Sequence, residues 1–231
     1  MISVNIDIEE IAQVLQNLFA GIREELDMRD NVREEAIRIT REIIRESGWA
    51  ITSLLANDME KCKKHIQRAK DLSKQLVGKL ENYPDILYSG LVYNALSEFV
   101  EAYTLYNILT KSTLPDFKKE FRVHHVPILQ GLGDVIGELR RYILELIRSG
   151  DYERAFAILK IMEALYMQLR GLDYPEALMP SVRHKTDVAR RLIDDTKALL
   201  IDIHNREKLR QSIEHLKKLE SSKEAVNQMN Q

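Results

Sequence analysis

The stretch LSEFVEAYTLYNILTK, residues 96 to 111, lies within an apolar run from Ile86 to Thr110 whose only charged side chains are Glu98 and Glu101. The run is long enough to span a bilayer. Its serine, threonine and asparagine residues and the two glutamates favour a helix buried in a protein core instead. A carboxylate withdrawn from water is costly unless a positive group meets it. The two glutamates therefore require a cationic partner.

The composition around this stretch is that of a globular protein. The 231 residues are 45% hydrophobic and 30% charged, and 34 basic residues against 36 acidic ones leave a net charge of −2. No overall field draws such a chain to nucleic acid or to a membrane, so polyanion binding requires local segregation of charge. The single cysteine, Cys62, excludes an intrachain disulfide and is typical of a reducing compartment, so we expect a cytoplasmic protein. The N-terminal residues have no basic segment ahead of an apolar stretch, and we expect no signal peptide.

Helical periodicity runs through nearly the whole chain. Glycine (9) and proline (5) are scarce, and apolar residues recur at spacings of three and four. This pattern predicts an all-α fold. One very long helix is expected first, with a break near Gly21 or near residues 30–31 as the alternative. Its apolar stripe comprises Ile8, Ile11, Val14, Leu15, Leu18 and Ile22.

Capping and breaking residues divide the remainder. They predict helices over about 58–80, from Pro84 to about Lys111, from Pro127 to residues 149–150, from Asp151 to Gly171, and from about 181 to at least 203, with a short piece after Pro115. The prediction is a bundle of about six or seven helices with long first, third and last helices. Residues 1–205 are expected to form one domain, followed by a polar, partly helical tail over 206–231.

Two pairs of acidic residues share helix faces. Glu98 and Glu101 are three residues apart, and Asp134 and Glu138, in GLGDVIGELRR (131–141), are four apart. Glycines surround the second pair at 131, 133 and 137, although each costs a helix about 1 kcal/mol relative to alanine. Glycines are tolerated in helices where another segment comes close. This pattern predicts two closely packed helices that offer four carboxylates to one place.

Four neighbouring carboxylates repel one another unless cations compensate. Mg²⁺, or alternatively Mn²⁺, suits such oxygen ligands, and two such ions can clamp a phosphodiester. The alternative is structural, because Arg140 or Arg141 can neutralise a buried glutamate. A ferritin-like di-iron centre is disfavoured, since histidine is absent three residues after Glu98 and Glu138.

Four motifs resemble translin and its partner, translin-associated factor X. They are LSEFVEA (96–102), GLGDVIGELRR (131–141), GDYERAFAILKIMEALYMQL (150–169) and RHKTDVARRLIDDTKALL (183–200), in matching order over about Ile22 to Ile203. The resemblance implies an all-helical protomer of about seven helices, a closed hollow octamer, binding of single-stranded RNA or DNA, and Mg²⁺-dependent cleavage of RNA.

The chain looks most similar to the catalytic factor-X branch, in the form found in prokaryotes. The acids of that branch map onto Glu98, Glu101, Asp134 and Glu138, and translin lacks acids at the first three positions. One departure concerns DILYSGLVYN (85–94), which has no basic residue where translin has a basic, histidine-bearing stretch.

A second set of candidates is basic. Lys61, Lys64, His65 and Arg68, in KCKKHIQRAK (61–70), share one face of a helix and align with a basic element that the family associates with nucleic acid. Such a stripe contacts phosphates without reading bases, and the alternative is an ordinary solvated face. Arg140 and Arg141 are further candidates, either for the scissile phosphate or as ion-pair partners.

These observations predict a metal-dependent endoribonuclease that binds single-stranded nucleic acid. Mg²⁺ held by Glu98, Glu101, Asp134 and Glu138 inside a hollow oligomer would activate water for in-line attack on RNA. The alternatives are a non-catalytic RNA- or DNA-binding protein of the translin type and a helical scaffold.

Overall fold

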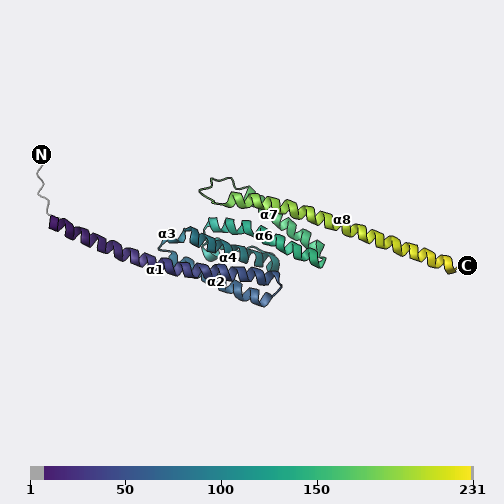
Figure 1. Cartoon of the computed structure of the whole chain (residues 1–231), viewed down its shortest axis with the longest axis horizontal. Helices are drawn as coiled ribbons and strands as arrows, with labels where there is room; N and C mark the ends of the chain where they lie inside the picture. Colours follow the sequence, from purple (N-terminus) through teal and green to yellow (C-terminus); the bar gives the residue numbers. More distant parts are fainter. Residues whose placement is uncertain (1–7, 230–231) are drawn as a thin grey trace. The chain divides into compact units, whose positions relative to one another are not determined.

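The structure, a computed structural model, describes residues 8–229, with side chains to residue 218 (Figure 1). The first seven residues, which belong to the segment considered as a signal peptide, and the last two of the predicted tail lie outside the described residues. Every regular element between them is a helix, so the all-α prediction is confirmed. Eight helices occur in the described part, against the predicted six or seven.

The chain divides into two compact units. The first contains Met1–Phe99 and Asp116–Val123, and the second contains Val100–Pro115 and His124–Gln231. The predicted single domain over residues 1–205 stays a prediction. None of the helices in the described part is both long and apolar enough to cross a membrane.

The first unit is built on two long helices, α1 (Ile8–Leu55) and α2 (Met59–Leu80). Helix α1 continues without interruption through Gly21 and residues 30–31, so the alternative break is absent. The second half of α1 packs on α2, and the Asp58 carboxylate caps α2 by accepting a hydrogen bond from the Lys61 amide at 3.2 Å. The buried side chains of this pair include Ile39, Ile43, Leu54, Ile66, Leu72 and Leu76.

The predicted third helix is wrong in one respect, because it is two helices. A short α3 (Pro84–Leu87) ends just before Tyr88, whose backbone is not helical, and α4 (Gly90–Lys111) begins two residues after that tyrosine. Serine and glycine at positions 89 and 90 are weaker helix formers than the leucines and alanines that follow. The sequence pattern on either side of this break is helical, so apolar spacing alone did not reveal it. Helix α5 (Phe117–Phe121) completes the first unit and packs Phe117 and Phe121 against Phe99.

The second unit comprises the C-terminal part of α4 with α6 (His125–Ser149), α7 (Tyr152–Arg170) and α8 (Val182–Met229). Helix α6 packs against both α7 and α8, which also pack on each other. Gly150 ends α6 at a φ of 81°, and Asp151 caps α7 by accepting from the Arg154 amide. Helix α8 is 48 residues long and continues through the predicted tail to Met229. The buried side chains include Ile136, Leu139, Ile143, Met162, Ala189 and Leu200.

Candidate functional site

The first pair of predicted acids lies on α4. Glu98 and Glu101 are one helical turn apart, Glu98 is half-buried, and Glu101 is only 8% exposed. The boundary between the two compact units falls after Phe99, so Glu98 belongs to the first unit and Glu101 to the second. A carboxylate as buried as that of Glu101 is retained only where its charge is compensated.

The second pair lies on α6, and there the structure supplies a partner that sequence reasoning missed. The Lys185 ammonium of α8 lies 2.5 Å from both carboxylate oxygens of Asp134. The two side chains are 27% and 31% exposed. Lys185 stands in the motif RHKTDVARR, so its presence was visible, but no spacing rule links position 185 to position 134.

Glu138 is paired with Arg141, one turn further along α6. The Arg141 guanidinium donates to both Glu138 oxygens at 2.9 and 3.0 Å. The structural alternative, in which Arg141 neutralises an acid, is thus found for Glu138. Arg140 is half-buried, and no group in the described part of the chain hydrogen-bonds to its Nε atom.

A close approach is found at Gly133, but the approaching element is α8 and not the second acid-bearing helix that the sequence pattern predicted. A Cβ atom on Gly133 would lie 3.0 Å from the Cβ of Lys185 and 3.3 Å from its Cδ. At Gly137 the nearest such atom is the Cδ1 of Leu192, at 4.0 Å. The absence of a side chain at Gly133 therefore lets the Lys185 stem lie against α6 and carry its ammonium to Asp134.

A metal ion would have to compete with these pairs. Oxygen donors of this kind are the ligands that Mg²⁺ and Mn²⁺ prefer. In the described part of the chain, however, no three histidine, cysteine, aspartate or glutamate side chains are grouped so as to hold an ion. The residues therefore have the chemistry of a Mg²⁺ site without its assembled geometry. The metal site stays a prediction, and it requires Lys185 to release Asp134.

The predicted basic stripe lies on α2. Lys61 forms an ion pair with Asp58 at 2.7 Å, and that hydrogen bond raises the pKa of the Lys61 ammonium. Lys64 is exposed. One exposed pair of this kind contributes little stability, so the ammonium of Lys61 can exchange Asp58 for a phosphate at small cost.

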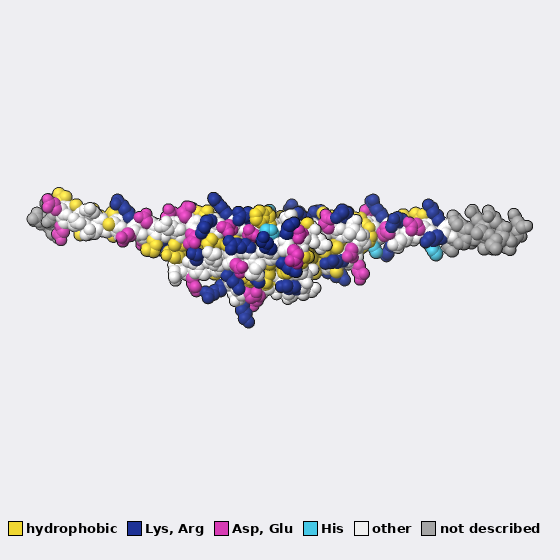
Figure 2. Space-filling view, turned by 90° about the horizontal axis from the view of Figure 1, so that it is seen from below, with side chains coloured by type: hydrophobic (Ala, Val, Ile, Leu, Met, Phe, Trp, Pro, Cys, Tyr) yellow, Lys and Arg dark blue, Asp and Glu magenta, His cyan; other side chains and the backbone are white. Residues whose placement is uncertain are grey.

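The other two residues of the stripe contact acids of α1. His65 Nδ1 lies 2.7 Å from Glu46 Oε2, and the Arg68 guanidinium donates to Glu42 Oε2 at 3.1 Å. Glu46 is 9% exposed. These acids reduce the net charge of the stripe, and Figure 2 shows acidic and basic side chains interspersed over the visible face of the protein.

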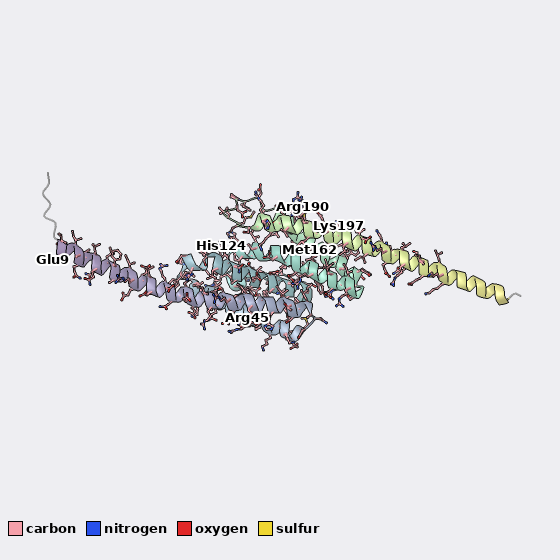
Figure 3. The ribbon with its side chains drawn as sticks, in the orientation of Figure 1. Glu9, Arg45, His124, Met162, Arg190 and Lys197 are labelled. Carbon is pink, nitrogen blue, oxygen red and sulfur yellow. The ribbon has the colours of Figure 1, made fainter. Side chains whose placement is uncertain are left out.

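An aromatic residue missed by the sequence analysis completes this face. Trp49 of α1 is 48% exposed, and its ring centroid lies 5.2 Å from that of His65. The Arg45 guanidinium, labelled in Figure 3, lies 5.2 Å from the same indole ring. Trp49 is the only tryptophan of the chain and follows Arg45 by four residues. The four-residue spacing of Arg45 and Trp49 on one helix was the sequence signal that could have predicted their contact.

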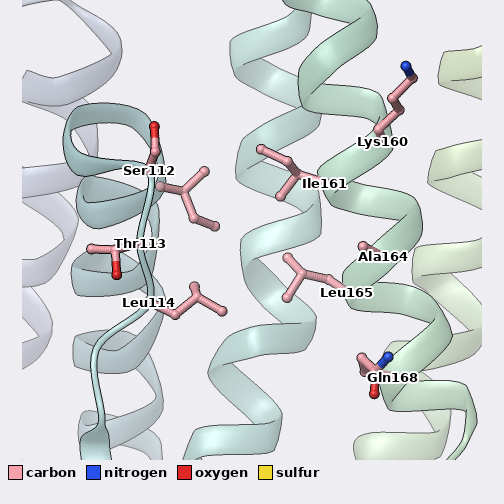
Figure 4. A pocket seen from close by; sticks show the side chains of 9 residues that line it. Ser112, Thr113, Leu114, Lys160, Ile161, Ala164, Leu165 and Gln168 are labelled. Atoms are coloured by element: carbon pink, nitrogen blue, oxygen red, sulfur yellow. The ribbon is translucent and has the colours of Figure 1, made fainter.

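A separate apolar cavity of about 620 Å³ lies in the second unit (Figure 4). None of the four predicted acids lines it. It is lined by the end of α4, the segment after it, and α7. The lining includes Ile108, Leu114, Ile161, Ala164 and Leu165. It offers shape and apolar surface but no cluster of titratable groups, so we assign it no chemistry.

The fold is that of an all-α helical protein, and comparison with known sequences identifies its family. The model of the Translin family matches residues 31–221. An uncharacterized protein of Methanocaldococcus jannaschii is 31% identical over 193 residues, which cover 83% of this chain and 84% of that protein. The chain belongs to the Translin family.

Solved structures agree with this assignment. The crystal structure of AfC3PO is 29% identical, with a TM-score of 0.75 over 81% of this chain and 97% of its own. The structure of AfC3PO in complex with duplex RNA gives a TM-score of 0.74 at the same identity and the same coverage. Apo-NeC3PO, at 24% identity and a TM-score of 0.72, covers 80% of this chain and 96% of its own, and shows likeness of fold alone.

Proposed function

We propose that this protein is a metal-dependent endoribonuclease and a single-stranded nucleic-acid-binding protein of the translin type. The observation that carries the proposal is the likeness to AfC3PO, a protein solved in complex with duplex RNA, at 29% identity over 81% of the chain. The substrate class is RNA that is single-stranded or partly unpaired, and single-stranded DNA is a second ligand.

In this proposal Glu98, Glu101, Asp134 and Glu138 hold Mg²⁺ or Mn²⁺. A divalent ion, when bound, supplies Lewis-acid stabilisation of the charge that develops on a phosphodiester. The chain's own part is to present the carboxylates from two helices and to keep them compensated before the ion arrives. Lys185 does this for Asp134, and Arg141 does it for Glu138.

RNA contact is assigned to the stripe of Lys61, Lys64, His65 and Arg68, with Arg140 and Arg141 beside the acids. Exposed cations next to an aromatic ring are the usual means of holding single strands, because bases stack on the ring while the cations meet phosphates. Trp49 and Arg45 therefore extend the stripe across α1. Copies of the chain assemble into a closed octamer in the cytoplasm, with the acids inside.

The test uses labelled single-stranded RNA and the purified full-length chain. Glu98→Gln and Asp134→Asn are expected to abolish cleavage in Mg²⁺ while gel shifts with RNA persist, because they remove metal ligands without touching the basic stripe. EDTA should stop the wild-type reaction. Cleavage by either variant at the wild-type rate would refute the assignment of the acids.

A second candidate is a non-catalytic protein that binds single-stranded RNA or DNA. The observation that favours it is the pairing of Asp134 with Lys185 and of Glu138 with Arg141, which satisfies both acids without an ion. RNA that is shifted but never cut, in Mg²⁺ or in Mn²⁺, would select this function. If neither RNA nor DNA gives a gel shift, the remaining alternative is a helical scaffold without a nucleic-acid role.

A further inference from the structure

The N-terminal half of α1 carries a large exposed apolar face. Every residue from Ile8 to Met28 is exposed. This segment continues beyond the part of α1 that packs on α2, and Figure 3 labels Glu9 near its start. The large apolar side chains on this face and their exposed fractions are Ile8 (75%), Ile11 (50%), Val14 (61%), Leu15 (47%), Leu18 (55%), Phe19 (54%), Ile22 (42%) and Leu26 (58%), and Met28 (58%) follows at the end of the segment.

The spacing of these residues is that of helices that pair with helices. Residues 8, 11, 15, 18 and 22 are separated by three, four, three and four positions, which is the seven-residue repeat of paired helices. Ala12, Val14, Phe19 and Leu26 widen the face on both sides. The opposite side of the helix is polar, with Glu9, Gln13, Gln16, Asn17, Arg23 and Asp27. The segment therefore has one continuous face that water solvates poorly.

The size of the face is sufficient for a stable contact. Eight large side chains that each remove about 80–100 Å² of apolar surface give roughly 1,300–1,600 Å² for two copies together, which is the range of standard protein interfaces. Isolated apolar residues on a surface need no explanation, but a contiguous patch of this extent indicates a docking site.

The net negative charge of the segment argues against a membrane or a nucleic acid as its partner. Residues 8–29 contain five acidic side chains, at positions 9, 10, 24, 25 and 27, and two arginines, at 23 and 29. Helices that lie on membranes are rich in lysine and arginine on the polar face, and nucleic acid requires the same sign. This segment has the opposite sign. A helix whose repeat matches itself fits a second copy, since the same face is then self-complementary.

We propose that the apolar face of residues 8–28 docks against the same face in a second copy of this chain. The segment precedes residue 31, where the match to the Translin family model begins. The inference deepens the self-association named under the proposed function and is independent of the nuclease assignment.

The first experiment measures particle mass by sedimentation of the full-length chain. Leu15→Glu combined with Leu18→Glu places two charges on the face, and Gln13→Glu combined with Gln16→Glu adds the same charges to the polar side. The first variant is expected to reduce the particle mass at least twofold, whereas the control keeps the wild-type mass. Equal masses for the wild type and the Leu15/Leu18 variant overturn the inference, whatever the RNA assay shows.

The second experiment identifies the contacting surface by cross-linking. Position 15 is central to the repeat, so Leu15→Cys should form a disulfide between two copies under a mild oxidant in either helix orientation. Ile8→Cys and Ile22→Cys then separate the orientations, because parallel helices link like with like and antiparallel helices link position 8 to position 22. Wild type is the control, since Cys62 is buried. Failure of Leu15→Cys to cross-link, or flotation of the chain with anionic vesicles, overturns the pairing.

Discussion

Gly133 and Lys185 lie so close together that an added methyl group on Gly133 would meet the lysine Cβ at 3.0 Å. That separation is tighter than ordinary van der Waals contact. The lysine stem runs from this contact to the Asp134 carboxylate, with its Nζ 2.5 Å from each oxygen. The ion pair between α6 and α8 therefore depends on the absence of a side chain at Gly133.

Gly133→Ala is expected to destabilise the protein by about 1–2 kcal/mol, because the added methyl group displaces the lysine stem and strains the pair with Asp134. Gly137→Ala is the matched control. Its nearest neighbour is 4.0 Å away, so it should be neutral or stabilise α6 by up to about 1 kcal/mol through helix propensity. Urea unfolding of the two variants measures both effects. Equal destabilisation by both would contradict the role given to Gly133.

Lys185→Met is expected to strengthen binding of Mg²⁺ or Mn²⁺ by about fivefold, because the ammonium no longer competes for Asp134 and a partly exposed pair contributes about 1 kcal/mol. Lys197, which lies on α8 like Lys185, forms a comparable ion pair with Glu163 of α7. Lys197→Met removes that pair and should leave the metal affinity unchanged. Calorimetric titration with the metal alone provides the measurement. An unchanged affinity in Lys185→Met, alongside loss of binding in Asp134→Asn, would exclude the competition but keep the metal site.

The sequence predicted the helices well because their signals are local. Asp58 and Asp151 cap the helices that they were expected to cap, and the scarcity of glycine and proline left few other boundaries. The break between α3 and α4 went unrecognised because Tyr88 and Ser89 leave the helical conformation without interrupting the apolar spacing.

The candidate site was predictable only in part. Acids on a single helix could be paired from their spacing, and the pair of Glu138 with Arg141 follows from the same rule. Lys185 reaches Asp134 across 51 positions of sequence, and His65 reaches Glu46 across 19. Such contacts depend on how helices pack, which periodicity does not specify.

Trp49→Ala is expected to weaken binding of single-stranded RNA by about fivefold or more, since stacking of one base is worth about 1–3 kcal/mol. Trp49 is the only tryptophan, so its fluorescence reports directly on the face that it shares with His65. RNA should quench the wild-type emission, and the quenching should saturate with the gel shift. Emission that stays constant while RNA binds would remove Trp49 from the interface.

Lys64→Glu is expected to weaken RNA binding and to flatten its dependence on salt, because one phosphate contact is lost and fewer counterions are released. Lys63→Glu makes the same change at the neighbouring exposed position, which lies off the stripe and pairs with Glu60. The comparison is made by titrating RNA at several salt concentrations. Similar losses in both variants would indicate a general charge effect and not a defined stripe.

Cys62 is expected to react slowly with alkylating reagents in the folded protein. Burial, with a smaller contribution from the charge of Asp58, raises the pKa of its thiol from 9.0 to about 11. The unfolded chain therefore loses this proton first, so the contribution of Cys62 to stability is present below about pH 9 and declines as the pH rises towards 11. Iodoacetamide labelling at pH 8, with and without urea, tests the reactivity. Equal labelling rates would place the thiol at the surface.

Helix α1 is one uninterrupted rod of 48 residues, yet its two halves are held by different forces. Amide protons near Ile43 and Ala50 are protected by packing on α2 and should exchange with deuterium only when the first unit opens. Those between Ile8 and Met28 have only the helix itself to slow them in a lone molecule. Their exchange rates should then fall as the protein concentration is raised. Deuterium uptake in this half of α1 would therefore measure the extent of self-association.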